Sequence, residues 1–260
     1  CTEASTGIDP SRMSFPSTIQ GLITSRIDML PSRQQLAVKV ASVIGRYFSY
    51  RALHDVHPVS ADKTTLSDDL AALVTAGVTV LHGREPELAY AFGHALTHEV
   101  AYGSLLYRQR CELHRALGRW YEQEHGSDLG AQAAVLAHHW SHAARGAPAD
   151  ATSFRKAIDY LELAGVQALR SYSNREAVRF LGDAVSLDAE RATATLGDDV
   201  IALAVTKEQL RRARWHSGLG HAHLALSDFA RCRADFYAAL ELLGHAVPRT
   251  PMRLGAGMLA

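Results

Sequence analysis

Two histidines, His94 and His98, stand one helical turn apart in the stretch FGHALTHEVAYGSLL, and Glu99 directly follows the second. A helical metalloprotease signature has two histidines at this spacing, but its glutamate adjoins the first histidine or precedes the second, where it reaches a zinc-bound water. Here the order is His-x-x-x-His-Glu, which places the carboxylate of Glu99 about 100° round the helix from His98. No third ligand is specified nearby, so we predict an amphipathic helix without a metal.

A second group of histidines lies in the stretch LAHHWSHA, where His138 and His142 share one face of a predicted helix and His139 lies between them. Two imidazoles at this spacing can chelate zinc, but a closed zinc site needs four ligands and a catalytic one usually has three. The chain has 14 histidines, so such pairs arise by chance. We predict that these histidines pack beside Trp140; a metal-dependent enzyme that uses the histidine clusters is an alternative.

The usual phosphate-binding and nucleophile motifs do not occur in the sequence. No G-x-x-x-x-G-K-[ST] loop is present, so the backbone nest and lysine that hold phosphates are missing. The GLG at 218–220 follows no predicted strand, whereas a dinucleotide-binding loop needs a strand-turn-helix context. Ser104 in YGSLL lacks the G-x-S-x-G turn that exposes a nucleophilic serine. We predict no catalytic, cofactor-binding or metal-binding residue here, and no enzyme activity for this segment.

Composition predicts a cytoplasmic protein with a substantial core. The 260 residues are 47% hydrophobic, and a chain of this length buries roughly 70–75% of its unfolded surface. The 27 basic residues balance the 27 acidic ones, so the chain has no net positive charge that would favour binding to nucleic acid or to an anionic membrane. Three distant cysteines, Cys1, Cys111 and Cys232, indicate neither disulfides nor a zinc knuckle. The sequence contains no apolar run that could span a membrane and no signal-peptide pattern.

The N-terminal part of the chain predicts a winged helix-turn-helix. Helical periodicity with capping-box patterns at Ser17 and Ser32 predicts two helices, the second ending at Gly45. A short helix capped by Ser49 and a helix over 62–76 should follow. Apolar residues then alternate with other residues on both sides of the turn HGREPE, a period of two that predicts a β-hairpin. Several helices followed by one hairpin are the outline of this fold.

The remainder of the chain predicts helices only, and its C-terminal part predicts tetratricopeptide-like repeats. The stretch that begins at Asn174 aligns with the stretch that begins at Asp228, so that small and large apolar residues match. The matched positions are further apart than the usual period of about 34 residues, and an extra helix over 199–205 would explain the difference. A simple helical bundle is the alternative. The matched pairs are Ala184 with Ala239 and Leu187 with Leu242.

The predicted fold class is therefore mainly α, with one β-hairpin in a winged helix followed by a helical repeat array. The helices expected after the hairpin cover 95–106, 107–124, 130–145 and 153–171. The expected domains are a linker at 1–15, the winged helix at 16–93, connecting helices at 94–150 and the repeats at 151–260.

A winged helix often binds DNA, and the charges here argue against that role. In the helix before the hairpin, Lys63 stands against three acidic residues, and at the tip of the hairpin Arg84 stands against two more. Both elements therefore repel phosphate, and most non-specific DNA affinity is electrostatic. We predict packing against another domain rather than duplex binding. The acidic residues are Asp62, Asp68 and Asp69 in the helix and Glu85 and Glu87 in the hairpin.

Four stretches together resemble the region that follows the ATPase module in large predicted signalling ATPases of the AAA/STAND type. They are FPSTIQGLITSRIDMLP, AVKVASVIGRYFSYRAL, LAYAFGHALTHEVAYGSLLYRQRCELHRALGRWYE and AVLAHHWSHA. The resemblance covers about residues 15–255 and includes AALELLGHAVPRTPMRL near the end. Many of these bacterial-type proteins carry a class III adenylate or guanylate cyclase domain; others carry a serine/threonine kinase or a LuxR-type DNA-binding domain.

This resemblance implies a non-catalytic regulatory segment of a signal-transduction ATPase. The chain begins at Cys1 and stops at LGAGMLA, so we expect a longer protein in which ATP and magnesium bind to an upstream domain. The winged helix would pack on that domain, and the repeats would bind a protein or small-molecule effector, with no membrane contact. A fragment of a LuxR-type ATP-dependent transcriptional regulator is an alternative. Tyr172, Asn174 and Arg175 are candidates for effector contacts, although ordinary turn and packing roles also explain them.

Overall fold

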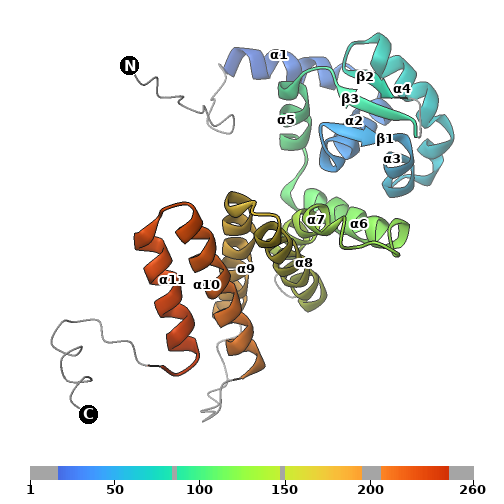
Figure 1. The fold of residues 1–260 in the computed structure, drawn as a ribbon. Helices are drawn as coiled ribbons and strands as arrows, with labels where there is room; N and C mark the ends of the chain where they lie inside the picture. The colour runs from blue at the N-terminus through green and yellow to red at the C-terminus, as the bar shows by residue number, and fades with distance from the viewer. Residues whose placement is uncertain (1–16, 84–86, 147–149, 195–205, 246–260) are drawn as a thin grey trace, which may run out of the picture. The chain divides into compact units, whose positions relative to one another are not determined.

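The computed structural model describes residues 17–83, 87–146, 150–194 and 206–245. These residues form eleven α-helices, a short 3-10 helix and a small three-stranded antiparallel sheet, so the expected mainly α class is confirmed (Figure 1). The chain divides into two compact units, Cys1–Leu113 and His114–Ala260. The division falls within α6 (Tyr107–Glu124), so the second part of that helix belongs to the second unit, in which every described element is a helix and which we call the helical unit.

The first unit contains all three described strands. Its order along the chain is α1 (Ser17–Asp28), α2 (Ser32–Ile44), β1 (Tyr47–Ser49), α3 (Tyr50–Val56), η2 (Ser60–Thr65), α4 (Leu66–Thr75), β2 (Thr79–Gly83), β3 (Ala89–Phe92) and α5 (Ala95–Gly103). The sheet order is β1-β3-β2, with Phe48 opposite Tyr90 and Val80 opposite Ala91. The predicted hairpin is therefore present, and its second strand also pairs with β1.

Local sequence signals explain where several of these elements begin and end. Gly45 follows α2 at φ 148°, a backbone conformation that favours glycine. The Ser49 hydroxyl accepts a hydrogen bond from the Ala52 amide at 3.1 Å, which caps α3 as predicted. After α4, the Val78 amide donates to the Leu73 carbonyl at 3.0 Å. That turn leads the chain directly into β2.

Two local expectations for this unit were wrong, and one strand was not expected. Strand β1 is not predicted by the sequence, because three residues before a helix show no clear alternation. The stretch 62–76 is not one helix, since a 3-10 helix precedes α4. No side-chain cap is present at the start of α2; instead the Gln35 amide donates to the carbonyls of Asp28 and Leu30, both at 2.9 Å.

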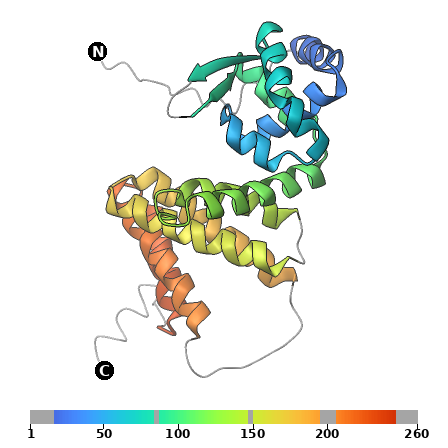
Figure 2. The same ribbon diagram turned by 90° about the vertical axis from the view of Figure 1, so that its right-hand side faces the viewer.

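The second unit is built from long helices that pack in sequence order. After α6 come α7 (Ala133–Arg145), α8 (Ala151–Arg170), α9 (Asn174–Ala194), α10 (Lys207–Ala225) and α11 (Phe229–Leu242). Figures 1 and 2 show α8 beside α9 and α10 beside α11. One apolar core runs through the unit and includes Trp140, Leu161, Leu181, Leu187 and Trp215.

Helices α8 and α9 form one helical hairpin, and α10 and α11 form a second. Equivalent residues of the two hairpins are separated by the same number of positions as Ala184 and Ala239. Tyr172 in the turn between α8 and α9 has φ 59°, and Ser227 in the turn between α10 and α11 has φ 60°. In both turns the amide of the next residue donates to the carbonyl five residues before it, which closes the helix end. These hydrogen bonds join Ser173 to Ala168 at 2.8 Å and Asp228 to His223 at 2.9 Å.

The close contact inside each hairpin repeats at the same offset. A Cβ atom on Gly165 would stand 2.6 Å from Leu181, and a Cβ atom on Gly220 would stand 2.8 Å from Phe236. Two hairpins of related design therefore follow one another in the chain. The linker expected at 1–15 and the helix expected over 199–205 lie outside the described residues.

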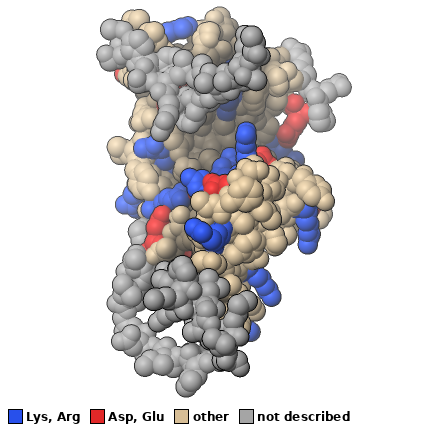
Figure 3. Space-filling view, turned by 60° about the vertical axis from the view of Figure 1, so that its left-hand side comes forward, with Lys and Arg blue, Asp and Glu red and all other residues tan. Residues whose placement is uncertain are grey.

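Charged side chains on these hairpins pair with one another. Arg211 of α10 contacts Asp159 and Glu162 of α8 at 2.7 and 2.6 Å. Arg212 of α10 pairs with Asp188 of α9 at 2.5 Å. On the face drawn in Figure 3, basic side chains are interspersed with acidic and uncharged ones. Within the described ranges, no helix is both long enough and apolar enough to cross a membrane.

Candidate functional site

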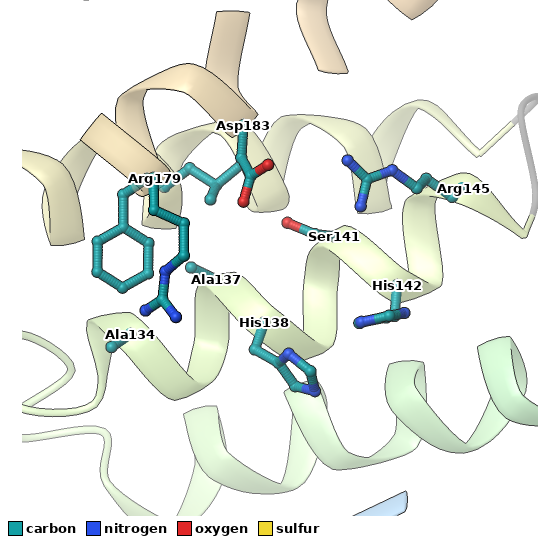
Figure 4. A pocket seen from close by; sticks show the side chains of 10 residues that line it. Ala134, Ala137, His138, Ser141, His142, Arg145, Arg179 and Asp183 are labelled. Atoms are coloured by element: carbon teal, nitrogen blue, oxygen red, sulfur yellow. The ribbon is translucent and has the colours of Figure 1, made fainter. Parts of the chain in front are cut away.

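A small polar cavity of about 150 Å³ lies in the helical unit between α7 and α9 (Figure 4). The helical period places positions 138, 141, 142 and 145 of α7 on one face, and Figure 4 shows side chains of α9 opposite them. The apolar part of the lining includes Leu161 and Phe180. The polar lining consists of His138, Ser141, His142 and Arg145 from α7 and Arg179 and Asp183 from α9.

The polar groups of this cavity are incompletely paired among the described residues. Ser141 is buried, and its hydroxyl has no hydrogen-bond partner within the described part of the chain. Arg145 makes a long ion pair of 3.9 Å with Glu190, and the Arg179 guanidinium lies 4.6 Å from the centre of the Phe180 ring. The charged lining is mixed, since the Asp183 carboxylate shares the cavity with the Arg145 and Arg179 guanidinium groups.

Next to the cavity, four histidines gather from two helices. His114 of α6 lies against three residues of α7, with ring centroids 5.3 Å from His138, 5.1 Å from His139 and 4.5 Å from His142. The Nδ1 atoms of His114 and His139 are 2.9 Å apart, a hydrogen bond in which one ring donates and the other accepts. His114 and His139 are each 1% exposed, whereas His138 reaches the surface.

The surroundings of these rings favour neutral imidazoles. Burial lowers the pKa of His139 to about 3, and the nearby rings of His138 and His142 add to the effect. Loss of solvent around its ring lowers the pKa of His138 to about 4, with further contributions from His142 and Arg179. Tyr121 stacks on His139 with centroids 5.5 Å apart. Both imidazoles are therefore uncharged at neutral pH.

A glycine lets the two helices approach closely enough for this contact. Gly118 follows His114 by one turn on the same face of α6, and a Cβ atom there would stand 2.7 Å from the Trp140 ring. Sequence reasoning identifies the three histidines of α7 but misses His114, which lies on a different helix in a stretch without a ligand pattern. The Gly118–Trp140 contact brings His114 close to the three histidines of α7. Residue spacing along the sequence does not predict this contact, because it joins two different helices.

The first histidine pair is not part of this group. The His98 ring nitrogen Nε2 lies 2.9 Å from the Ser42 carbonyl, and Phe92 packs edge-on against the ring at 5.2 Å. Burial is the largest cause of a lowered pKa for His98. His94 is the exposed residue that precedes α5. Among the described residues, neither belongs to a group of three possible metal ligands.

A further polar cluster joins α10 to α11. The carboxylate of Asp235 lies 3.0 Å from Nδ1 of His216 and 2.8 Å from Nδ1 of His223. The Nε2 atom of His223 is buried and has no partner in the described ranges. The second hairpin thus has a polar centre where the first has an apolar one. The equivalent residues of the first hairpin are Leu161, Ala168 and Phe180.

The turn residues considered for effector contacts lie near the surface. Tyr172 is 86% exposed at the tip of the first hairpin, Asn174 is half-buried and Arg175 is exposed in the first turn of α9. None of the three lines the cavity or belongs to the histidine group.

No family model, curated protein or solved structure matches this chain.

Proposed function

We propose that this chain is a non-catalytic regulatory and interaction segment of a multidomain signal-transduction ATPase, in line with the sequence resemblance to cyclase-linked proteins. In this proposal, residues 16–93 act as a winged helix that packs on the nucleotide-binding module. The helical hairpins act as tetratricopeptide-like repeats that bind a protein or small-molecule effector. Effector binding would favour one domain arrangement by a few kcal/mol and so change the populations of the states.

The element order of the first unit supports the winged-helix part of the proposal. The order α2-β1-α3-α4-β2-β3 places a short strand after the first helix of the motif and a hairpin after the last. The three strands form one sheet in the order β1-β3-β2, so the hairpin is joined to the segment between the helices.

The repetition of the hairpin in the second unit is the observation that carries the proposal. Helical repeat proteins place the same hairpin again and again so that each pair buries its apolar face on the next. The turn conformation and the glycine contact both recur here at one constant offset. Arrays of this kind bind partners through surfaces that several repeats share.

The charge of α4 supports a docking role for the first unit rather than a DNA-binding role. The helix has the sequence LSDDLAALVT and therefore no basic residue. Asp69 is buried and pairs with Arg33 at 3.5 Å, and the Lys63 ammonium donates to the Asp55 carbonyl at 3.0 Å. Without positive charge on this helix, most of the electrostatic affinity for a duplex is lost. Arg84, at the tip of the hairpin, lies outside the described residues.

The reading frame upstream of Cys1 tests the proposal most directly. We expect a G-x-x-x-x-G-K-[ST] loop roughly 200–350 residues before this chain, a distance set by the usual size of one or two domains. The domain before that loop would identify the output as a cyclase, a kinase or a transcriptional regulator. A reading frame that begins near Cys1 without a nucleotide site would contradict the ATPase-coupled role.

A DNA titration separates this proposal from the transcription-factor alternative. The chain is mixed with a labelled duplex at low salt, where phosphate contacts are strongest. We expect a flat titration. Salt-sensitive binding that is weakened by Lys63→Glu, just before α4, would instead favour a direct role for the first unit in DNA recognition.

A further inference from the structure

We propose that His114, His138 and His139 form a binding site for a divalent transition-metal ion, for which zinc is the best fit. The site goes beyond the proposed regulatory function and does not depend on an upstream ATPase. All three residues belong to the helical unit, one from α6 and two adjacent residues from α7. The sequence alone favours no metal in this region, because it does not place His114 beside the other two.

The spacing of the three rings fits one tetrahedral metal ion. Three imidazoles that bind one zinc at ~2.0–2.1 Å have ring centroids about 5.2 Å apart, from the tetrahedral angle and the ring size. The observed centroid distances are 5.3 Å for His114–His138, 5.1 Å for His114–His139 and 5.2 Å for His138–His139.

The ring nitrogens converge as well as the ring centres. Each of the three residues offers one nitrogen, and these atoms all lie within 4.8 Å of one another. A tetrahedral zinc needs its nitrogen ligands about 3.4 Å apart. The Nδ1 atoms of His114 and His139 are already at 2.9 Å. To hold one ion, the longest of these separations, at most 4.8 Å, must become about 3.4 Å by rotation of the rings.

The chemistry of the group selects the class of metal. Imidazole nitrogens suit zinc, copper, nickel and cobalt, whereas magnesium and calcium require oxygen ligands. Neutral imidazole is the form that binds a metal ion. The proton in the His114–His139 hydrogen bond can move to the outer nitrogen of its ring, so metal binding needs no change in the charge of the two imidazoles.

Three protein ligands leave one coordination position open. His138 reaches the surface and also lines the polar cavity, so this residue links the metal position to solvent. A water molecule can complete the coordination. His142 stacks face to face on the His114 ring, with planes 15° apart, and so covers that ring rather than pointing to the ion.

A cobalt titration of the whole chain tests the site. The protein is prepared without a histidine tag, treated with a chelator and titrated with Co²⁺, which gives a visible absorption band of high intensity when its coordination is tetrahedral. We expect one equivalent to bind, zinc to displace the cobalt, and zinc to raise the melting temperature. His138→Ala should weaken binding at least about tenfold. Because His138 reaches the surface, this variant is expected to fold, which circular dichroism verifies.

Two control variants make the assignment specific. His221→Ala and His245→Ala remove exposed histidines of the same unit, and both should retain the tetrahedral band and its stoichiometry. Absence of the band in the parent chain would overturn the proposal and leave the cluster as a hydrogen-bonded packing contact. Equal weakening by His138→Ala and His221→Ala would overturn the assignment of three ligands. Neither outcome depends on whether the chain regulates an ATPase.

Discussion

Leu181 lies between glycines of two different helices. A Cβ atom on Gly165 of α8 would stand 2.6 Å from this side chain, and one on Gly218 of α10 would stand 2.7 Å from it. Leu181 is 2% exposed, so other side chains surround it on nearly every side. The absence of a side chain at these two glycines therefore allows α8 and α10 to pack closely against Leu181 of α9.

A methyl group at Gly165 is therefore expected to destabilise the helical unit. Gly165→Ala should lower the free energy of unfolding by about 1–3 kcal/mol, because an overpacked core must shift its side chains. Gly182→Ala on α9 is the matched control, since nothing lies within 4 Å of a Cβ atom there. That variant should leave stability unchanged or raise it by up to about 1 kcal/mol. Urea unfolding of both variants measures the difference, and equal effects would contradict the packing argument.

A second residue-scale prediction concerns His98. Its folded-state pKa lies below the ordinary value of 6.5, chiefly because of burial. The unfolded chain therefore binds more protons than the folded chain just below pH 6.5. The stability that depends on neutral His98 is complete above that pH and is lost as the pH falls. His98→Gln keeps a donor for the Ser42 carbonyl but does not titrate. Urea unfolding at pH 7.5 and 5.5 should show a larger loss for the parent than for the variant; identical losses would contradict the prediction.

At the scale of elements, the hairpin turns show how the repeats are defined. Both turns contain a non-glycine residue at positive φ, Tyr172 and Ser227, followed by a residue whose amide closes the preceding helix. The left-handed conformation costs an L-residue roughly 1–2 kcal/mol. The closing hydrogen bonds and the contacts between paired helices outweigh that cost in each hairpin.

Glycine at the first of these turns should stabilise the protein. Tyr172 is 86% exposed, so Tyr172→Gly removes little packing and relieves the left-handed backbone. We expect a gain of about 0.5–1 kcal/mol, measured by thermal unfolding. Ala189→Gly, at an exposed position of α9, should instead cost about 1 kcal/mol. A loss of stability in Tyr172→Gly would contradict this prediction and indicate a stabilising contact of the tyrosine ring.

At the scale of the whole molecule, the helical unit has a core of its own. Among the described residues, its buried cluster extends from Ala133 to Ala222 and contains no residue of the first unit. Helix α6 completes this core, because Gly118 lies against Trp140 and His114 against His139. The boundary within α6 thus has a physical reason: part of that helix covers α7.

A fragment that includes the whole of α6 is expected to fold independently. Residues 107–245 should give a helical circular dichroism spectrum and one cooperative melting transition, because the apolar core is retained. Residues 133–245 are the control, since the loss of α6 uncovers Trp140, which is 1% exposed in the parent chain. This shorter fragment should melt at a lower temperature. Equal melting temperatures would mean that α6 does not contribute to the helical core.

The sequence by itself determined the order and type of most elements. Helical periodicity located the helices because an apolar stripe every 3.6 residues must be buried, and the change to period 2 located the hairpin. Capping at Ser49 and termination at Gly45 are local effects that depend on a few neighbouring residues. The offset between the two helical hairpins was visible for a related reason, since similar hairpins need similar residues at equivalent positions.

Only the tertiary structure decided which distant residues meet. Strand β1 exists because β3 pairs with it, and pairing of this kind leaves little trace in a three-residue segment. The histidine group exists because Gly118 permits a close approach of α6 to Trp140, so that His114 reaches residues of another helix. Sequence spacing reports neighbours on one helix, whereas contact between helices depends on packing across the core.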